Sequence, residues 1–241
     1  MNILFFTKQA ALYGANKSLF TMIVGLQDEG HSAVVVTSVK GQLNRVLNEM
    51  DIPNFVLPFK PWYYTSDESF FLKKVRNKIV QSYKCTSANY KVARNCKEII
   101  DRHNIQLIYS NSSTSHIGYI VSKMYKLPHI WHIREFLGLH FNFKWSFGEY
   151  LSRKMIQTAD KVITVSQTLK DHHCRVVGDK PIQVIYDGVV SVDHFEDNAG
   201  LRALEKRDTK YFVFAIIGSI SKSKGQMQAL LALAEAKKSL V

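Results

Sequence analysis

The segment Pro128-His129-Ile130-Trp131-His132-Ile133-Arg134-Glu135-Phe136 is the most informative part of this 241-residue chain. A proline precedes a run of β-branched and aromatic residues, and charged residues follow it, as expected for a buried strand that ends at the edge of a sheet. Similar short runs recur along the chain, separated by longer amphipathic stretches with helical spacing. This alternation predicts an α/β fold in which βαβ units form a doubly wound, mostly parallel, Rossmann-like sheet.

The expected elements alternate from the first residues onward. Strands are expected at 2–6, 33–37, 54–57, 107–110, 129–133, 161–165 and 183–186. Helices are expected at 16–29, 42–50, 70–83, 88–103, 115–126, 146–158 and 167–176. Together they form a first domain over residues 1–190.

The C-terminal part differs in character. Residues 191–208 are polar and lack a core-forming period, which predicts an inter-domain linker. Residues 211–217 look like a buried strand, and a helix opens near Lys224-Gly225. One strand and one helix cannot bury a core. We therefore expect residues 209–241 to begin a second Rossmann-like domain that is cut off at Val241.

Composition sets limits on the function. A share of 46% hydrophobic and 22% charged residues is ordinary for a globular protein. Three widely spaced cysteines have no metal-ligand spacing, so we expect no metal site and a reducing compartment. No uncharged apolar stretch approaches the roughly 20 residues that cross a bilayer. We expect a cytoplasmic protein, soluble or peripheral on the inner face of the plasma membrane.

The net charge of +12 indicates an anionic partner. Nucleic acid, acidic lipid and phosphorylated substrates all satisfy that condition. Basic residues are dispersed, and no helix-turn-helix, zinc-finger or RNA-recognition signature is present, which argues against nucleic acid.

The loop after the first strand contains Gly14-Ala15-Asn16-Lys17. Glycine permits the close approach of a ligand, and the amides at a helix start attract anions and sugar hydroxyls. The loop is not G-x-G-x-x-G, so the dinucleotide fingerprint is absent. The alternative is an ordinary turn in which Asn16 caps the helix.

Two further strand ends carry polar residues. Asn111 lies in a run of serines and threonines that can bind a polyol, although helix capping also explains such a run. His132, Arg134 and Glu135 are expected in the ligand cleft, because ligands of such sheets bind at the carboxyl ends of strands. His132 can donate to a hydroxyl, Arg134 can pair with phosphate, and Glu135 can hold either side chain in place. The alternative is a surface Arg–Glu pair beside a core histidine.

Residues 62–80 combine aromatic and basic residues. Trp62-Tyr63-Tyr64 precedes a segment in which Phe71, Leu72, Val75 and Ile79 have helical spacing between lysines and arginines. This pattern suits a helix lying on an anionic membrane surface. The alternative is that the apolar stripe packs on the domain and the lysines are solvated.

Five segments follow one another along the chain: Gly14-Ala15, His132-Ile133-Arg134-Glu135, Ala159-Asp160 to Ser166, Tyr186-Asp187-Gly188-Val189, and Gly218 followed by Lys224-Gly225-Gln226. In this order they resemble glycosyltransferase family 4, whose members are retaining enzymes of the GT-B fold with two facing Rossmann-like domains. Within the family, the sequence is most similar to transferases that build bacterial capsular or other surface polysaccharides. The resemblance implies a nucleotide-diphosphate sugar as donor, a saccharide or lipid-linked acceptor, and no cofactor or metal.

The resemblance also implies roles for single residues. Residues 14–17 would face the donor phosphates and the acceptor, and His132 would contact the transferred sugar. Lys224, with Gly218 and Ser219, would bind the donor diphosphate.

The sequence departs from the family at several points. Tyr13 replaces a frequent second glycine, Asp187 replaces the usual asparagine of an Asn-Gly-Val turn, and Ser219 replaces a common arginine. The family's donor-holding carboxylates would lie beyond Val241, so we expect the chain alone to be an incomplete catalyst. The alternative is a non-catalytic module that binds a glycan or a partner.

Overall fold

The structure is a computed structural model that describes residues 1–64, 71–136, 144–177, 181–188, 214–218, 220 and 224–239. The chain divides into two compact units, Met1–Val189 and Val190–Val241. The expected linker at 191–208 lies outside the described residues.

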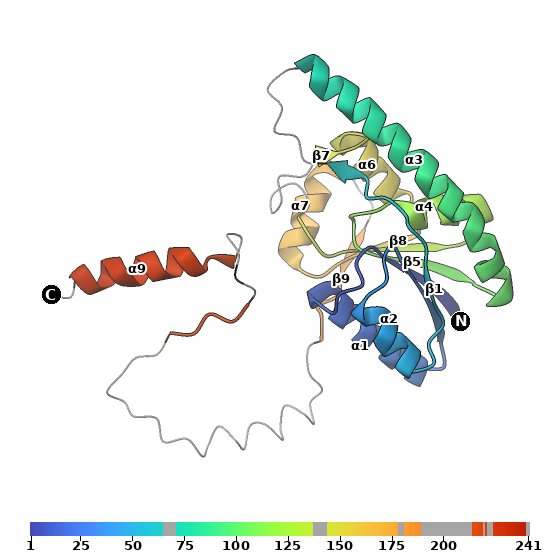
Figure 1. The fold of residues 1–241 in the computed structure, drawn as a ribbon, viewed down its shortest axis with the longest axis horizontal. Coiled ribbons are helices and arrows are strands. Elements are labelled where there is room, and N and C mark those ends of the chain that lie inside the picture. The colour runs from blue at the N-terminus through green and yellow to red at the C-terminus, as the bar shows by residue number, and fades with distance from the viewer. Residues whose placement is uncertain are drawn as a thin grey trace. The chain divides into compact units, whose positions relative to one another are not determined.

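The first unit is built on a parallel sheet of seven strands in the order β3-β2-β1-β5-β6-β8-β9 (Figure 1). The strands are β1 (Asn2–Thr7), β2 (Ser32–Thr37), β3 (Asn54–Val56), β5 (Leu107–Asn111), β6 (His129–Ile133), β8 (Lys161–Thr164) and β9 (Ile182–Val184). All seven expected strands are present, within a few residues of their expected bounds. The prediction of an α/β, Rossmann-like doubly wound sheet is confirmed.

Helices cover both faces of the sheet (Figure 1). They are α1 (Gly14–Asp28), α2 (Gln42–Glu49), α3 (Phe71–Arg102), α4 (Ile117–Tyr125), α6 (Glu149–Gln157) and α7 (Gln167–Val177). Alternate residues of β1 show the two layers, because Phe5 packs with residues of α1 and α2 while Leu4 and Phe6 pack with residues of α3 and α4. This alternation follows from the two-residue period of a strand.

Successive strands are added to one side of β1 up to β3, and from β5 onward they are added to its other side. The chain runs from β1 through β2 to β3 on one side, then returns to β5 and continues to β9 on the other. In a doubly wound sheet this switch point opens a crevice outside the carboxyl ends of the strands. The end of β1 leads into α1, and the end of β5 is Asn111.

One expectation about the helices was wrong. The two helices expected at 70–83 and 88–103 are one 32-residue helix, α3. No glycine or proline interrupts residues 84–87, and the hydroxyl of Thr86 donates to the carbonyl of Ser82 within the helix. Cys85 is also buried, so this turn packs against the domain and stays helical.

A small antiparallel ribbon was not predicted. Strand β4 (Tyr63–Tyr64) pairs with β7 (Lys144–Trp145), and two residues are too few to give a strand signal. The ribbon places Trp62 in the core at 0% exposure, where its ring stacks on Trp131 with 5.4 Å between centroids. Trp62 therefore cannot belong to a membrane-facing surface, which corrects the first part of the 62–80 expectation.

In the second unit the structure describes one helix, α9 (Gln226–Ser239). The strand expected at 211–217 is not formed over residues 214–217, where Ile217 is 98% exposed. Residues 211–213 lie outside the described residues. A strand is stable only when neighbours complete its hydrogen bonds, and no strand is described within this unit to pair with it.

Candidate functional site

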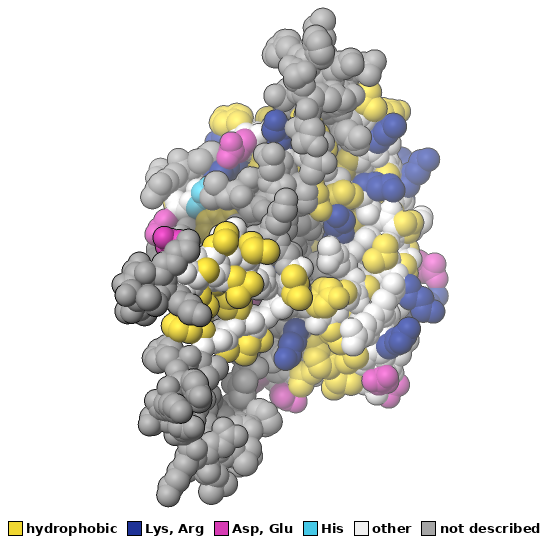
Figure 2. Space-filling model, turned by 60° about the vertical axis from the view of Figure 1, so that its left-hand side comes forward, with side chains coloured by type: hydrophobic (Ala, Val, Ile, Leu, Met, Phe, Trp, Pro, Cys, Tyr) yellow, Lys and Arg dark blue, Asp and Glu magenta, His cyan; other side chains and the backbone are white. Residues whose placement is uncertain are grey.

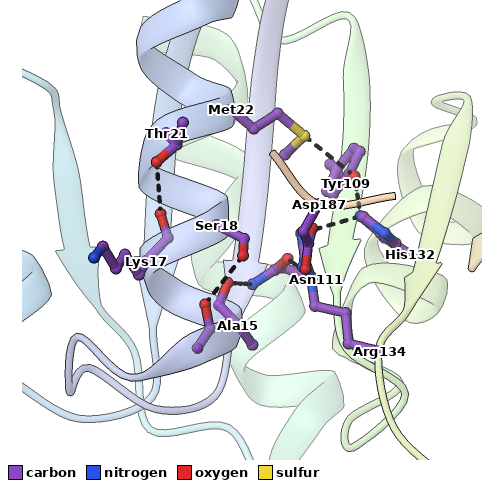
Figure 3. A network of polar contacts seen from close by, with 11 residues as sticks. Ala15, Lys17, Ser18, Thr21, Met22, Tyr109, Asn111, His132, Arg134 and Asp187 are labelled. Atoms are coloured by element: carbon purple, nitrogen blue, oxygen red, sulfur yellow. Dashed lines mark hydrogen bonds and ion pairs between the residues drawn. The ribbon is translucent and has the colours of Figure 1, made fainter. Parts of the chain in front are cut away.

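Polar side chains converge at the switch point of the sheet (Figure 3). They come from the first turns of α1, from the ends of β5 and β6, and from the segment that follows β9. In Figure 3, Asn111, Arg134 and Asp187 lie together beside the start of α1, with His132 and Tyr109 next to them.

The loop from β1 to α1 is held by Asn16, which is buried. Its amide nitrogen donates to the carbonyls of Gln9 and Ala11, and its amide oxygen accepts a bond from the hydroxyl of Thr7. Helix α1 begins at Gly14, so Asn16 lies inside the helix and the capping alternative is wrong. All the polar atoms of this side chain are occupied, so Asn16 shapes the loop.

Gly14 and Lys17 lie beside open space. A Cβ atom added at Gly14 would meet no atom within 4 Å. A small pocket of about 80 Å³ is lined by Gly14, Lys17, Ser18, Thr21 and Gly188. The positive end of α1, without an acidic residue in its first turn, and the ammonium of Lys17 favour an anion here.

Asn111 connects this loop to β6. Its amide nitrogen donates to the carbonyl of Ala15 at 3.2 Å, and its amide oxygen accepts a bond from Nε of Arg134 at 2.7 Å. The expected loop residue Ala15 thus contributes its carbonyl. Asn111 is 1% exposed, so its amide fixes the relative positions of the two strand ends.

Arg134 is held by Asp187. Its Nη1 lies 2.7 Å from both carboxylate oxygens of Asp187, and its side chain is only 5% exposed. The alternative of a surface Arg–Glu pair is therefore wrong. A phosphate would have to compete with the carboxylate of Asp187 for this guanidinium.

The side chain of Glu135 points to the loop after β5. One of its oxygens accepts bonds from the hydroxyls of Ser112 and Ser113 and from the backbone amide of Ser113. Burial raises the pKa of this carboxyl above its usual range, while these bonds and the nearby charge of Arg134 lower it. The carboxylate holds the loop after β5, and the expectation that it directly holds His132 or Arg134 is not met.

His132 is a buried neutral imidazole. Its Nδ1 lies 2.6 Å from the hydroxyl of Tyr109 and 3.3 Å from Nη2 of Arg134. Burial, and then the charge of Arg134, lowers the pKa of the ring to about 3, although the charge of Asp187 raises it. Within the described part of the chain, its buried Nε2 has no hydrogen-bond partner.

Sequence reasoning missed Tyr109 as a site residue and treated Asp187 only as part of a turn. Tyr109 sits in the middle of β5, where its ring packs against Phe5 and gives the ordinary pattern of a core residue. Its hydroxyl meets His132 only because β5 and β6 are neighbours, with Tyr109 opposite Ile130 in the register. The position of Asp187 after the last strand of the sheet was the available signal for that residue.

The remaining expected residues belong to the second unit. Gly218 is exposed, and Lys224 precedes α9 by two residues. Ser219 lies outside the described residues. Their role in binding a diphosphate stays a prediction.

Among the described residues, no three His, Cys, Asp or Glu side chains are grouped so that they could hold a metal ion. That the protein needs no metal or cofactor stays a prediction.

The sequence profile described as Glycosyltransferase Family 4 matches residues 13–191. The chain belongs to glycosyltransferase family 4. The match covers the start of α1, the ends of β5 and β6, and Asp187, so these parts of the candidate site lie within the family domain. None of the curated proteins compared with the sequence matches it.

Two solved structures of HepE show the same fold. HepE from Anabaena, in complex with UDP-glucose, is 21% identical with a TM-score of 0.61, and the match covers 98% of this chain and 57% of HepE. The complex of HepE with UDP and glucose gives the same identity and TM-score and covers 58% of that chain. MurG from Acinetobacter baumannii is 10% identical with a TM-score of 0.49, over 78% of this chain and 46% of MurG. The expected GT-B-like fold is confirmed, and the chain spans less than two thirds of the length of HepE.

Proposed function

We propose that this chain is the acceptor-side part of a retaining, hexosyltransferase-type glycosyltransferase that uses a nucleotide-diphosphate sugar. The sugar is transferred to a hydroxyl of a saccharide or lipid-linked acceptor in the synthesis of a cell-surface polysaccharide. In this reaction the bond from the anomeric carbon to the diphosphate breaks and a bond to the acceptor oxygen forms on the same face. The nucleoside diphosphate and the acceptor proton are released.

The observation that carries the proposal is the unpartnered Nε2 of His132 at the switch point of a family 4 domain. A buried polar atom without a partner costs about 1–3 kcal/mol, and such atoms are rare in folded proteins. A hydroxyl of the transferred sugar would give Nε2 its missing partner. His132 is 3% exposed, so a ligand reaches Nε2 only when a covering group moves.

The groups at the start of α1 favour the binding of a diphosphate near His132. The pocket at Gly14 and Lys17 offers a helix N-terminus, an ammonium group and room at the glycine. These groups suit the phosphates of a sugar nucleotide. HepE, which has this fold, was solved with UDP-glucose bound, and this makes a uridine donor the first to test.

A donor screen on the gene product that contains this sequence tests the proposal. Sugar nucleotides with uridine, guanosine, adenosine or thymidine would each be mixed with saccharide and polyprenyl-phosphate acceptors, and release of nucleoside diphosphate would be measured. We expect acceptor-dependent release with one donor, and a product whose anomeric configuration, read by proton NMR, equals that of the donor. Binding of a glycan without turnover of any donor would instead favour the binding-module alternative, and an inverted product would refute retention.

We also propose that the protein works at the inner face of the plasma membrane and binds acidic lipid through α3. Residues 71–97 of this helix contain eight lysines and arginines and no aspartate or glutamate. Ile79, Tyr83 and Tyr90 are 64%, 74% and 48% exposed, and their spacing of four and seven residues places them on one face of the helix. Figure 2 shows basic side chains interspersed with exposed hydrophobic ones on the drawn face of the molecule. An apolar stripe flanked by cations suits a bilayer surface with anionic headgroups.

Flotation with vesicles tests this second proposal. We expect binding to vesicles rich in phosphatidylglycerol at low salt, no binding to neutral vesicles, and loss of binding when Lys84, Lys91 and Arg94 are changed to Glu. A variant with Arg45, Lys123 and Lys161 changed to Glu carries the same charge change on other elements and should still bind. Equal binding by both variants, or no binding by the unmodified protein, would refute membrane docking through α3. No helix among the described residues is long and apolar enough to cross a bilayer.

A further inference from the structure

The two neighbours of Nδ1 in His132 can both act as donors. The guanidinium of Arg134 only donates hydrogen bonds, and its Nη2 is 3.3 Å from Nδ1. The hydroxyl of Tyr109 is 2.6 Å from Nδ1, and burial raises the pKa of this phenol, so it keeps its proton. A nitrogen that accepts from both neighbours holds a lone pair, so the proton of the neutral ring is on Nε2.

Among the residues that the structure describes, one other acceptor competes for the hydroxyl of Tyr109. The hydroxyl also lies 3.4 Å from the sulfur of Met22. A thioether is a weak acceptor, whereas an imidazole nitrogen is a good one and is closer. The proton of Tyr109 is therefore directed at His132. Figure 3 shows both contacts of this hydroxyl as dashed lines.

Arg134 is itself fixed from three sides. Its Nε donates to Asn111, its Nη1 donates to Asp187, and its Nη2 faces His132. A planar guanidinium with partners in three directions has little freedom to turn. The carboxylate of Asp187 also places a negative charge next to the guanidinium.

We propose that Tyr109 is a positioning residue that, together with Arg134 held by Asp187, fixes His132 in the tautomer that presents Nε2–H to the substrate. This inference rests on the proposed function for the identity of the substrate. The ring then meets a sugar oxygen as a hydrogen-bond donor. The ion pair between Arg134 and Asp187 is part of this support.

Nitrogen-15 NMR of the protein labelled at histidine tests the tautomer without any substrate. His132→Gln identifies the signals of this ring by their disappearance. We expect Nε2 to carry the proton and Nδ1 to show the shift of a hydrogen-bonded, unprotonated nitrogen. In Tyr109→Phe, the Nδ1 signal should move toward that of a nitrogen without a strong hydrogen bond. A proton on Nδ1 in the unmodified protein would overturn the proposal, and this result can be obtained even if Tyr109→Phe does not fold.

Kinetics test whether the positioning matters for turnover. We expect Tyr109→Phe to lower kcat about tenfold, the effect of losing roughly one hydrogen bond in the transition state, with little change in the KM of the donor. Tyr125→Phe is the matched control, because its hydroxyl contacts the carbonyl of Ala93, outside the site, and its loss should leave kcat unchanged. An unchanged kcat in Tyr109→Phe would overturn the proposal. If the unmodified protein turns over no donor, the proposed function fails, and the NMR result still decides the tautomer.

Discussion

Mild acid should destabilise this protein through three buried neutral histidines. His116, His132 and His173 are each 3% exposed or less, and burial lowers the pKa of each ring from 6.5 to about 3. The unfolded chain takes up a proton at each ring as the pH falls below 6.5, while the folded protein does not. The free energy of unfolding is therefore not reduced by these rings above pH 6.5, and it decreases as the pH falls from 6.5 toward 3.

The size of the effect follows from these pKa values. At pH 5.5, about one unit below the unfolded pKa, each ring lowers the free energy of unfolding by about 1.4 kcal/mol relative to pH 7.5. The three rings together contribute about 4 kcal/mol, a large part of the 5–15 kcal/mol that is typical of a folded domain. We expect the urea midpoint to fall markedly over this range.

Urea unfolding at pH 7.5 and 5.5 measures this loss, and His116→Phe isolates one ring. The ring of His116 stacks on Trp62 at 5.1 Å, so an aromatic replacement preserves that contact. The loss of stability between the two pH values should be about 1.4 kcal/mol smaller in His116→Phe than in the unmodified protein. Other titrating groups contribute equally to both proteins and cancel. An equal loss in the two proteins would refute the reasoning that His116 is neutral in the folded state.

Three further substitutions have definite expected outcomes. Gly118→Ala would place a Cβ 2.1 Å from Oγ of Ser110 and 3.1 Å from Nε2 of His129, so we expect about 1–3 kcal/mol of destabilisation, and an unchanged urea midpoint would contradict this. Trp62→Ala removes a fully buried ring and should cost about 3–5 kcal/mol, whereas a cost near zero in the same assay would show that this ring is not part of the core. Arg134→Lys keeps the charge but cannot reach three partners at once, so turnover should fall about tenfold while the thermal midpoint changes little, and full activity would refute a positioning role.

The sheet could be predicted because each strand carries its own local signal. The run from His129 to Ile133 is apolar and β-branched, follows a proline and ends before charged residues. Such signals depend on near neighbours in the sequence, and they also placed His132 and Arg134 correctly at the carboxyl edge. The continuity of α3 was missed because the interior contacts of Cys85 belong to the tertiary structure.

The pairing of side chains in the site could not be predicted in the same way. Arg134 bonds to Asp187 across 53 residues, and Tyr109 reaches His132 across 23 residues. Glu135 was the nearer candidate partner in sequence, yet successive residues of an extended chain point to opposite sides, and its carboxylate turns to the loop after β5. The pairing of charged side chains depends on strand order and on side-chain direction. No local sequence pattern predicts which residues these will bring together.

We have proposed that His132 donates a hydrogen bond to the substrate of a glycosyl transfer. The most direct test is kcat of His132→Gln at saturating donor, with the thermal midpoint measured on the same sample and His31→Gln as a control remote from the site. We expect turnover to fall about a hundredfold or more, as for the loss of a well-placed hydrogen-bond donor, with a small change in thermal midpoint and no change in the control. Full turnover in His132→Gln, or a loss of activity matched by a loss of folded protein, would contradict the claim and assign His132 to the core.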